Sequence, residues 1–124
     1  SGLRPTKQRI KLAEFLFNRD KTFHFTVENL DRAINKKSAE DKIALATIYN
    51  TVEAFTNAGY LKEILTSKNK SYYDTNIKSH HHFYDEGSKE LTDIHYSQIK
   101  LSKVPVPPKG KKIKNLEVVI RIQK

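Results

Sequence analysis

The chain has 124 residues, of which 37% are hydrophobic and 30% are charged. This balance is too apolar for a disordered chain and too charged for a membrane protein, and no stretch approaches the ~20 apolar residues of a membrane-spanning helix. The net charge of +9 favours a polyanionic partner, most simply nucleic acid, although basic proteins also use lysine for solubility. Without a signal-peptide pattern we expect a cytoplasmic protein with no membrane partner. Without cysteine, disulfides and thiolate metal sites are excluded.

Three helices are predicted in the part of the chain that ends at Gly59, each by apolar residues at helical spacing. The first begins at Pro5 or Thr6, the second is capped by Thr26, and the third ends where Gly59 supplies a left-handed residue. The apolar positions are Ile10, Ala13 and Phe17 in the first helix, Val27, Leu30 and Ile34 in the second, and Ile48, Val52 and Phe55 in the third.

Two short strands, residues 60–65 and 71–75, are predicted next, around a polar turn. Three helices and a hairpin indicate a winged helix-turn-helix, whose last helix enters the DNA major groove. On that helix Thr47, Tyr49 and Asn50 lie largely off the apolar stripe. They suit base reading, because an amide pairs with adenine and ring edges contact thymine methyl groups, although such polar residues are often plain surface. The basic residues expected to contact phosphates at the first helix are Arg4, Lys7 and Arg9.

From residue 77 onward the sequence pattern changes. A polar bridge over residues 77–82 is followed by FYDEGSKELTDI, which predicts a hairpin, and by a short helical stretch expected at 95–103. The prolines of VPVPPKGKK exclude regular structure there, and the alternation in NLEVVIRIQK predicts a half-buried strand. So short a segment buries little by itself, so we expect it to pair with a second copy. The predicted fold class is α+β, with a winged helix-turn-helix in 1–76 and a small α/β dimerisation domain in 77–124.

Three consecutive histidines, His80 to His82, are the strongest candidates for chemistry. Side chains alternate along an extended segment, so His80 and His82 point to one side and His81 to the other. Asp74 lies six residues before His80, and Asp93 is expected on the partner strand of the hairpin. Histidine and carboxylate without sulfur suit Fe²⁺, Mn²⁺ or Zn²⁺ without choosing among them. Two interpretations stay open: a divalent metal site, or a polar linker that binds only adventitious metal.

Almost the whole chain resembles the ferric uptake regulator superfamily. The resemblance rests on the order LRPTKQRIKLAEFLF, HFTVENL, ALATIYNTVEAFTNAGYL, YYD and HHHF, with ATIYNTVEAFTNAG similar to the recognition-helix signature of the family. Members are dimeric, metal-responsive bacterial transcription regulators with an N-terminal winged helix and a C-terminal α/β dimerisation domain. The resemblance therefore implies a homodimer that binds double-stranded DNA at an AT-rich palindromic operator.

The same resemblance implies residue roles. Arg4 matches the basic residue that enters the minor groove, and Tyr49 matches the tyrosine that meets thymines. His24, in the loop before the second helix, would let the two domains share one metal ion. The implied ligands of that ion are His24, Asp74, His80, His82 and Asp93.

Three departures from the family pattern affect the expected sites. Many members hold a structural zinc on two Cys-x-x-Cys pairs, whereas Asp85 and Ser88 occupy the places of the first pair and the second is absent. We therefore expect no structural four-cysteine zinc. Asn50 stands where most members have arginine, so the operator is expected to differ. Lys100 replaces an acidic ligand of a further family site and argues against that site.

Within the superfamily, HHHFYDEG and LEVVIR are most similar to the iron response regulator branch, which answers to haem or iron status. This narrower resemblance implies haem as a second candidate cofactor, contacted by His80, His81 and His82, with His81 as the axial ligand. The leading hypothesis is a metal- or haem-responsive regulator of iron and haem genes.

Two alternatives to that hypothesis stay open. A peroxide sensor of the same superfamily is the first, because histidine and aspartate around Fe²⁺ undergo metal-catalysed oxidation. A metal-dependent hydrolase is the second, and it needs an open coordination position and a substrate pocket. The sequence indicates neither an open coordination position nor a substrate pocket, so we expect that the protein is not an enzyme.

Overall fold

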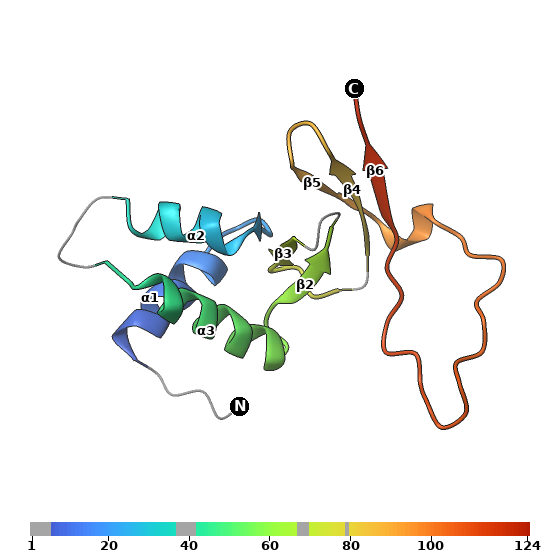
Figure 1. Cartoon of the computed structure of the whole chain (residues 1–124), viewed down its shortest axis with the longest axis horizontal. Helices are drawn as coiled ribbons and strands as arrows, with labels where there is room; N and C mark the ends of the chain where they lie inside the picture. Colours follow the sequence, from blue (N-terminus) through green and yellow to red (C-terminus); the bar gives the residue numbers. More distant parts are fainter. Residues whose placement is uncertain (1–5, 37–41, 67–69, 79) are drawn as a thin grey trace. The chain divides into compact units, whose positions relative to one another are not determined.

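A computed structural model describes residues 6–36, 42–66, 70–78 and 80–124, which form two compact units divided between Ile77 and Lys78 (Figure 1). Arg4, a predicted phosphate contact, lies outside the described residues. No helix in the described ranges is long and apolar enough to cross a membrane.

Three helices form the N-terminal unit: α1 (Lys7–Phe17), α2 (Val27–Ile34) and α3 (Leu45–Asn57). Thr6 caps α1 by accepting the Arg9 N–H, and Thr26 caps α2 in a reciprocal pair with Asn29. At the end of α3, Gly59 has φ +88°, and the Tyr60 N–H reaches back to the Phe55 carbonyl over 2.9 Å. This is the glycine-ended termination that the sequence predicts.

The core of this unit is formed by the apolar faces of the helices together with the sheet that follows. In α2 and α3 the buried residues sit at predicted apolar positions. In α1 the predicted positions are wrong, because Leu12 and Leu16 form the buried face while Ile10 and Phe17 are 49% and 39% exposed. Residues before and after the helices join this core. The buried members are Leu12, Leu16, Phe25, Val27, Leu30, Ile43, Ile48, Val52, Phe55 and Leu61.

A three-stranded sheet completes the N-terminal unit, in the order β1 (His24–Phe25), β3 (Ser71–Asp74), β2 (Lys62–Leu65). The β2–β3 hairpin confirms the predicted wing. The prediction of a loop at His24 is wrong, because His24 and Phe25 pair with β3. Two residues are too few to show alternation, so only the pairing partner reveals this strand.

The C-terminal unit contains a second three-stranded sheet, in the order β5 (Leu91–Ile94), β4 (His81–Asp85), β6 (Val119–Ile122). β4 and β5 form the predicted antiparallel hairpin, and β6, the predicted final strand, pairs with β4 in parallel. Between β5 and β6 the chain makes the long excursion without strands that is drawn in orange in Figure 1.

The helix predicted over residues 95–103 is wrong in extent. Only one 3₁₀ turn forms, η2 (Tyr96–Gln98), begun by His95, whose Nδ1 accepts the Ser97 N–H. Ile99 is already extended. The segment lacks a sustained apolar stripe, so burial of apolar side chains does not offset the conformational entropy lost in lengthening the turn into an α-helix.

The turn between β4 and β5 is closed by Asp85. Its Oδ1 accepts the N–H of Gly87 at 2.9 Å and of Ser88 at 3.2 Å, and its carbonyl accepts the Lys89 N–H at 2.7 Å. Asp85 and Ser88 are the two positions at which the family resemblance expects cysteine. At this position an aspartate carboxylate that accepts hydrogen bonds from its own turn, together with one backbone bond, orders the hairpin.

Asp85→Ala should lower the free energy of unfolding by about 1 kcal/mol, because two backbone N–H groups lose their acceptor. Asp85→Asn should lose little, since an asparagine oxygen makes the same turn. Urea denaturation followed by circular dichroism measures both variants. Equal stability of Asp85→Ala and the wild type would show that the turn does not depend on the carboxylate.

Candidate metal centre

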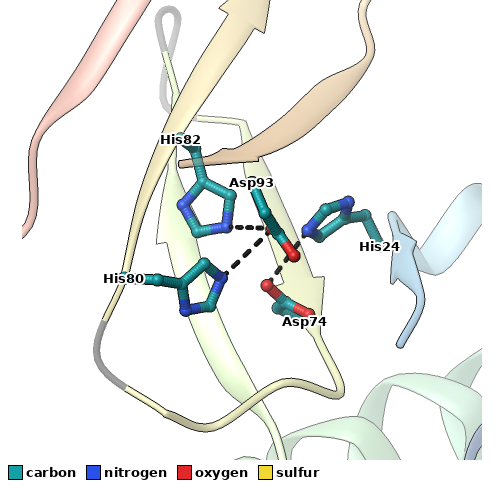
Figure 2. A group of neighbouring side chains, drawn as sticks. All are labelled: His24, Asp74, His80, His82 and Asp93. Atoms are coloured by element: carbon teal, nitrogen blue, oxygen red, sulfur yellow. Dashed lines mark hydrogen bonds and ion pairs between the residues drawn. The ribbon is translucent and has the colours of Figure 1, made fainter. Parts of the chain in front are cut away.

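A histidine and an aspartate face each other in the N-terminal sheet. His24 on β1 pairs directly with Asp74 on β3, and His24 Nε2 lies 3.0 Å from Asp74 Oδ2 (Figure 2). The Asp74 side chain is fully buried, and its Oδ1 accepts the Asn76 N–H at 2.8 Å. One carboxylate oxygen is thus held by the backbone while the other is aimed at an imidazole, which is the orientation that a metal-binding carboxylate needs.

Two histidines and an aspartate converge in the C-terminal sheet. His82 on β4 pairs directly with Asp93 on β5, and His80 comes two residues earlier on the same side. The Nε2 atoms of His80 and His82 each lie 3.2 Å from Asp93 Oδ1, and the two ring centroids are 4.4 Å apart (Figure 2). His82 is fully buried. The structure therefore brings together three of the side chains that the sequence selects.

The protonation of His80 bears on whether this triad suits a cation. Its Nδ1 lies 2.6 Å from the Lys78 carbonyl oxygen, which only accepts hydrogen bonds, so Nδ1 carries the proton. In the neutral ring Nε2 then presents a lone pair to a carboxylate oxygen. That contact is favourable only if a proton or a cation lies between the two atoms, and a carbonyl-oriented histidine is a common form of metal ligand. The donors fit a divalent ion.

His81 points to the opposite side of β4, as the alternation predicts. Its Nδ1 accepts the Val118 N–H over 2.9 Å, and the residue is 8% exposed. It therefore fastens β4 to the segment that leads into β6. The three histidines do not share one face, and the predicted haem contact by His80, His81 and His82 gains no support from this arrangement.

The predicted DNA-reading residues lie together on α3. Tyr49 and Asn50 are exposed and Thr47 is half-buried, while on α1 Lys7 is exposed and Arg9 is half-buried. The Tyr49 hydroxyl donates to Glu28 Oε2 at 2.7 Å. This hydrogen bond lowers the pKa of the Glu28 carboxyl and raises the pKa of the Tyr49 phenol. Glu28 and Tyr49 are 21 residues apart, and no pattern in the sequence indicates this contact.

Comparison with known proteins decides the family. A family model described as the ferric uptake regulator family matches residues 1–121. The chain belongs to the ferric uptake regulator family. The peroxide-responsive repressor PerR of Staphylococcus epidermidis is 30% identical over 99 residues, which are 80% of this chain and 63% of that protein. The peroxide operon regulator of Bacillus subtilis is 29% identical over 96 residues, covering 77% of this chain and 63% of that protein.

Less than two thirds of the length of these relatives is thus matched by the chain. Among solved structures, the ferric uptake regulator from Francisella tularensis with iron has a TM-score of 0.75 at 18% identity. That match covers 99% of this chain and 92% of the other. The ferric uptake regulator from Pseudomonas aeruginosa with manganese has a TM-score of 0.71 at 22% identity, covering 99% and 91%.

These similarities confirm the predicted α+β fold class. The narrower resemblance to the iron response regulator branch finds no support in these relatives, because the curated ones are named for peroxide.

His82→Ala and Asp93→Ala should each weaken binding of Mn²⁺ or Zn²⁺ by at least about ten-fold, since each removes a converging donor. Calorimetric titration of the metal-stripped full chain measures this. His95→Ala is the matched control, because His95 is an exposed histidine bonded to Ser97. A His82→Ala loss no larger than that of His95→Ala would mean that the triad binds metal only adventitiously.

Proposed function

We propose that this protein is a metal-responsive regulator of transcription that binds double-stranded DNA as a homodimer. The observation that carries the proposal is the close contact of imidazole nitrogen with carboxylate oxygen in each unit, in a chain whose N-terminal unit has a winged-helix fold. The proposed ligands of the regulatory ion are His24, Asp74, His80, His82 and Asp93.

We propose that one ion is shared by both units. Neither unit alone offers four donors from this set, and a metal site closed by protein ligands takes four. Asp74 and His80 are six residues apart, so their Cα atoms are never more than ~20 Å apart and a common ion is within reach. An ion held from both sides favours one orientation of the DNA-binding unit over others, and this differential affinity is what couples metal binding to DNA binding.

DNA binding is proposed for the exposed face of α3. Asn50 would pair with adenine and the Tyr49 ring would contact thymine methyl groups, with Thr47 beside them. Lys7 and Arg9 would contact phosphates, and Arg4 stays a prediction from the sequence. The net charge of +9 supports a polyanionic partner, and the side chains suit an AT-rich operator whose palindrome matches a two-fold dimer.

Exposed apolar side chains in the C-terminal unit support the proposed homodimer. They lie on β6 and on the excursion before it, where Val106 is 90% exposed. β6 is also an edge strand of its sheet. Apolar surface of this kind in a unit with a small core is typical of a subunit interface. The exposed residues are Val104, Val106, Ile113, Leu116, Ile120 and Ile122.

Peroxide is the second candidate signal. The Staphylococcus epidermidis and Bacillus subtilis relatives are named as a peroxide-responsive repressor and a peroxide operon regulator, and a histidine and aspartate site around Fe²⁺ is open to metal-catalysed oxidation. The donors themselves do not discriminate among Fe²⁺, Mn²⁺ and Zn²⁺. The alternative signal is metal occupancy itself, as in a regulator of iron homeostasis genes.

Metal should change the affinity of the wild type for DNA, and His24→Ala should reduce that change by about five-fold or more, the usual size of an allosteric coupling. The measurement is fluorescence anisotropy with a duplex selected by the protein from a random library, with and without Mn²⁺. Asn50→Ala is the control, because it should weaken DNA binding and leave the metal effect intact. A metal effect that survives in His24→Ala would show that the ion is not shared.

With Fe²⁺ bound, peroxide should add one oxygen atom to His24 or His80, because the oxidant forms at the metal and reacts first with the side chains nearest to it. Mass spectrometry of the peptides identifies the site, and the same treatment with Zn²⁺ should leave both unmodified. His95 serves as the internal control within each sample. Unmodified ligands in the iron-loaded protein would remove peroxide as the signal and leave metal occupancy.

A further inference from the structure

The contact between Glu28 and Tyr49 joins the two helices of the DNA-binding motif. Glu28 is in the first turn of α2, and Tyr49 is on α3 with 45% of its surface exposed. The 2.7 Å distance from the phenol oxygen to Oε2 is that of a charge-assisted hydrogen bond. The hydroxyl group of an exposed tyrosine on α3 is thus hydrogen-bonded to α2.

The surroundings keep Glu28 ionised and able to accept. It lies at the N-terminus of α2, where the helix dipole favours an anion. Arg32 on the same helix and Lys70 before β3 each lower the pKa of its carboxyl further, after the larger effect of Tyr49. An acidic side chain with cationic neighbours is therefore placed on the face that is proposed to approach a polyanion.

We propose that Glu28 is a positioning residue for DNA reading, which holds the Tyr49 ring in one orientation by accepting the hydrogen bond of its hydroxyl group. This inference rests on the proposed DNA-binding function. With the hydroxyl donated to Glu28, the ring meets DNA through its carbon edge, which suits a thymine methyl group. The tether also removes in advance the rotamer freedom that Tyr49 would otherwise lose on binding.

A carboxylate at this position has a second effect. It repels phosphates of any sequence equally, whereas the oriented ring favours only the correct bases. The repulsion therefore lowers operator affinity and random-DNA affinity alike and cancels in their ratio, so Glu28 increases the ratio only through the ring that it orients. The ratio, and not affinity itself, is the quantity that reports the role of Glu28.

The experiment compares Glu28→Ala, Glu28→Gln, Tyr49→Phe and the Glu28→Ala/Tyr49→Phe double variant in the full chain. Each binds a duplex selected by the wild type from a random library and a scrambled duplex of equal composition, with Mn²⁺ present. Glu14→Gln controls for charge, since Glu14 is an exposed acid on α1. Tyr60→Phe controls for loss of a phenol, since Tyr60 is 48% exposed and packs on Phe17 and Phe55.

Glu28→Ala and Tyr49→Phe should each lower the affinity ratio by about three- to ten-fold, as expected for freeing one side chain. The double variant should lose no more than the larger single loss, because the same hydrogen bond is removed. Glu28→Gln should keep most of the ratio, since its amide oxygen still accepts. Both controls should leave the ratio unchanged.

Absorbance titration of the six tyrosines tests the tether without DNA. The phenol signal that disappears in Tyr49→Phe should titrate at lower pH in Glu28→Ala, because the acceptor that raises its pKa is gone. An unshifted Tyr49 pKa, or an affinity ratio unchanged in Glu28→Ala, would overturn the positioning role alone. A wild type with no preference for any selected duplex would overturn the DNA-binding proposal itself, and the positioning role with it.

Discussion

Antiparallel register decides the candidate metal centre, because in both sheets it sets a histidine directly opposite an aspartate. His24 faces Asp74 across β1 and β3, and His82 faces Asp93 across β4 and β5. A slip of one residue would turn each candidate ligand to the opposite face of its sheet. Buried apolar side chains prevent such a slip.

The register is anchored differently in the two units. In the N-terminal sheet Phe25, next to His24, belongs to the main core, so moving β1 would expose a fully buried ring. In the C-terminal sheet the buried pair Tyr84 and Leu91 lies two residues along from His82 and Asp93, on the same face. Burial of these apolar and aromatic side chains thus supplies the free energy that fixes the register of the candidate metal ligands.

Electrostatics support a cation where these histidines and aspartates meet. Carboxylate oxygens and imidazole nitrogens that face one another in a buried setting are costly unless a proton or cation lies between them. On the face that we propose for DNA binding, the acid Glu28 has basic neighbours and accepts a hydrogen bond from Tyr49. In both places a carboxylate contacts a side chain for which we propose a role in binding, and this contact fixes the orientation of that side chain.

By itself the sequence determined the three N-terminal helices, the wing, the C-terminal hairpin and the final strand, because helical and alternating apolar patterns depend only on neighbours along the chain. It also selected His80, His82, Asp74 and Asp93 as a group, since side-chain alternation and hairpin pairing are local geometry. Through resemblance alone it added His24. Only the tertiary structure decided that His24 lies in a strand opposite Asp74, that His81 bonds to the segment before β6, and that Glu28 holds Tyr49. Each of those contacts joins residues that are distant along the chain and carry no periodic signal, so folding alone brings them together.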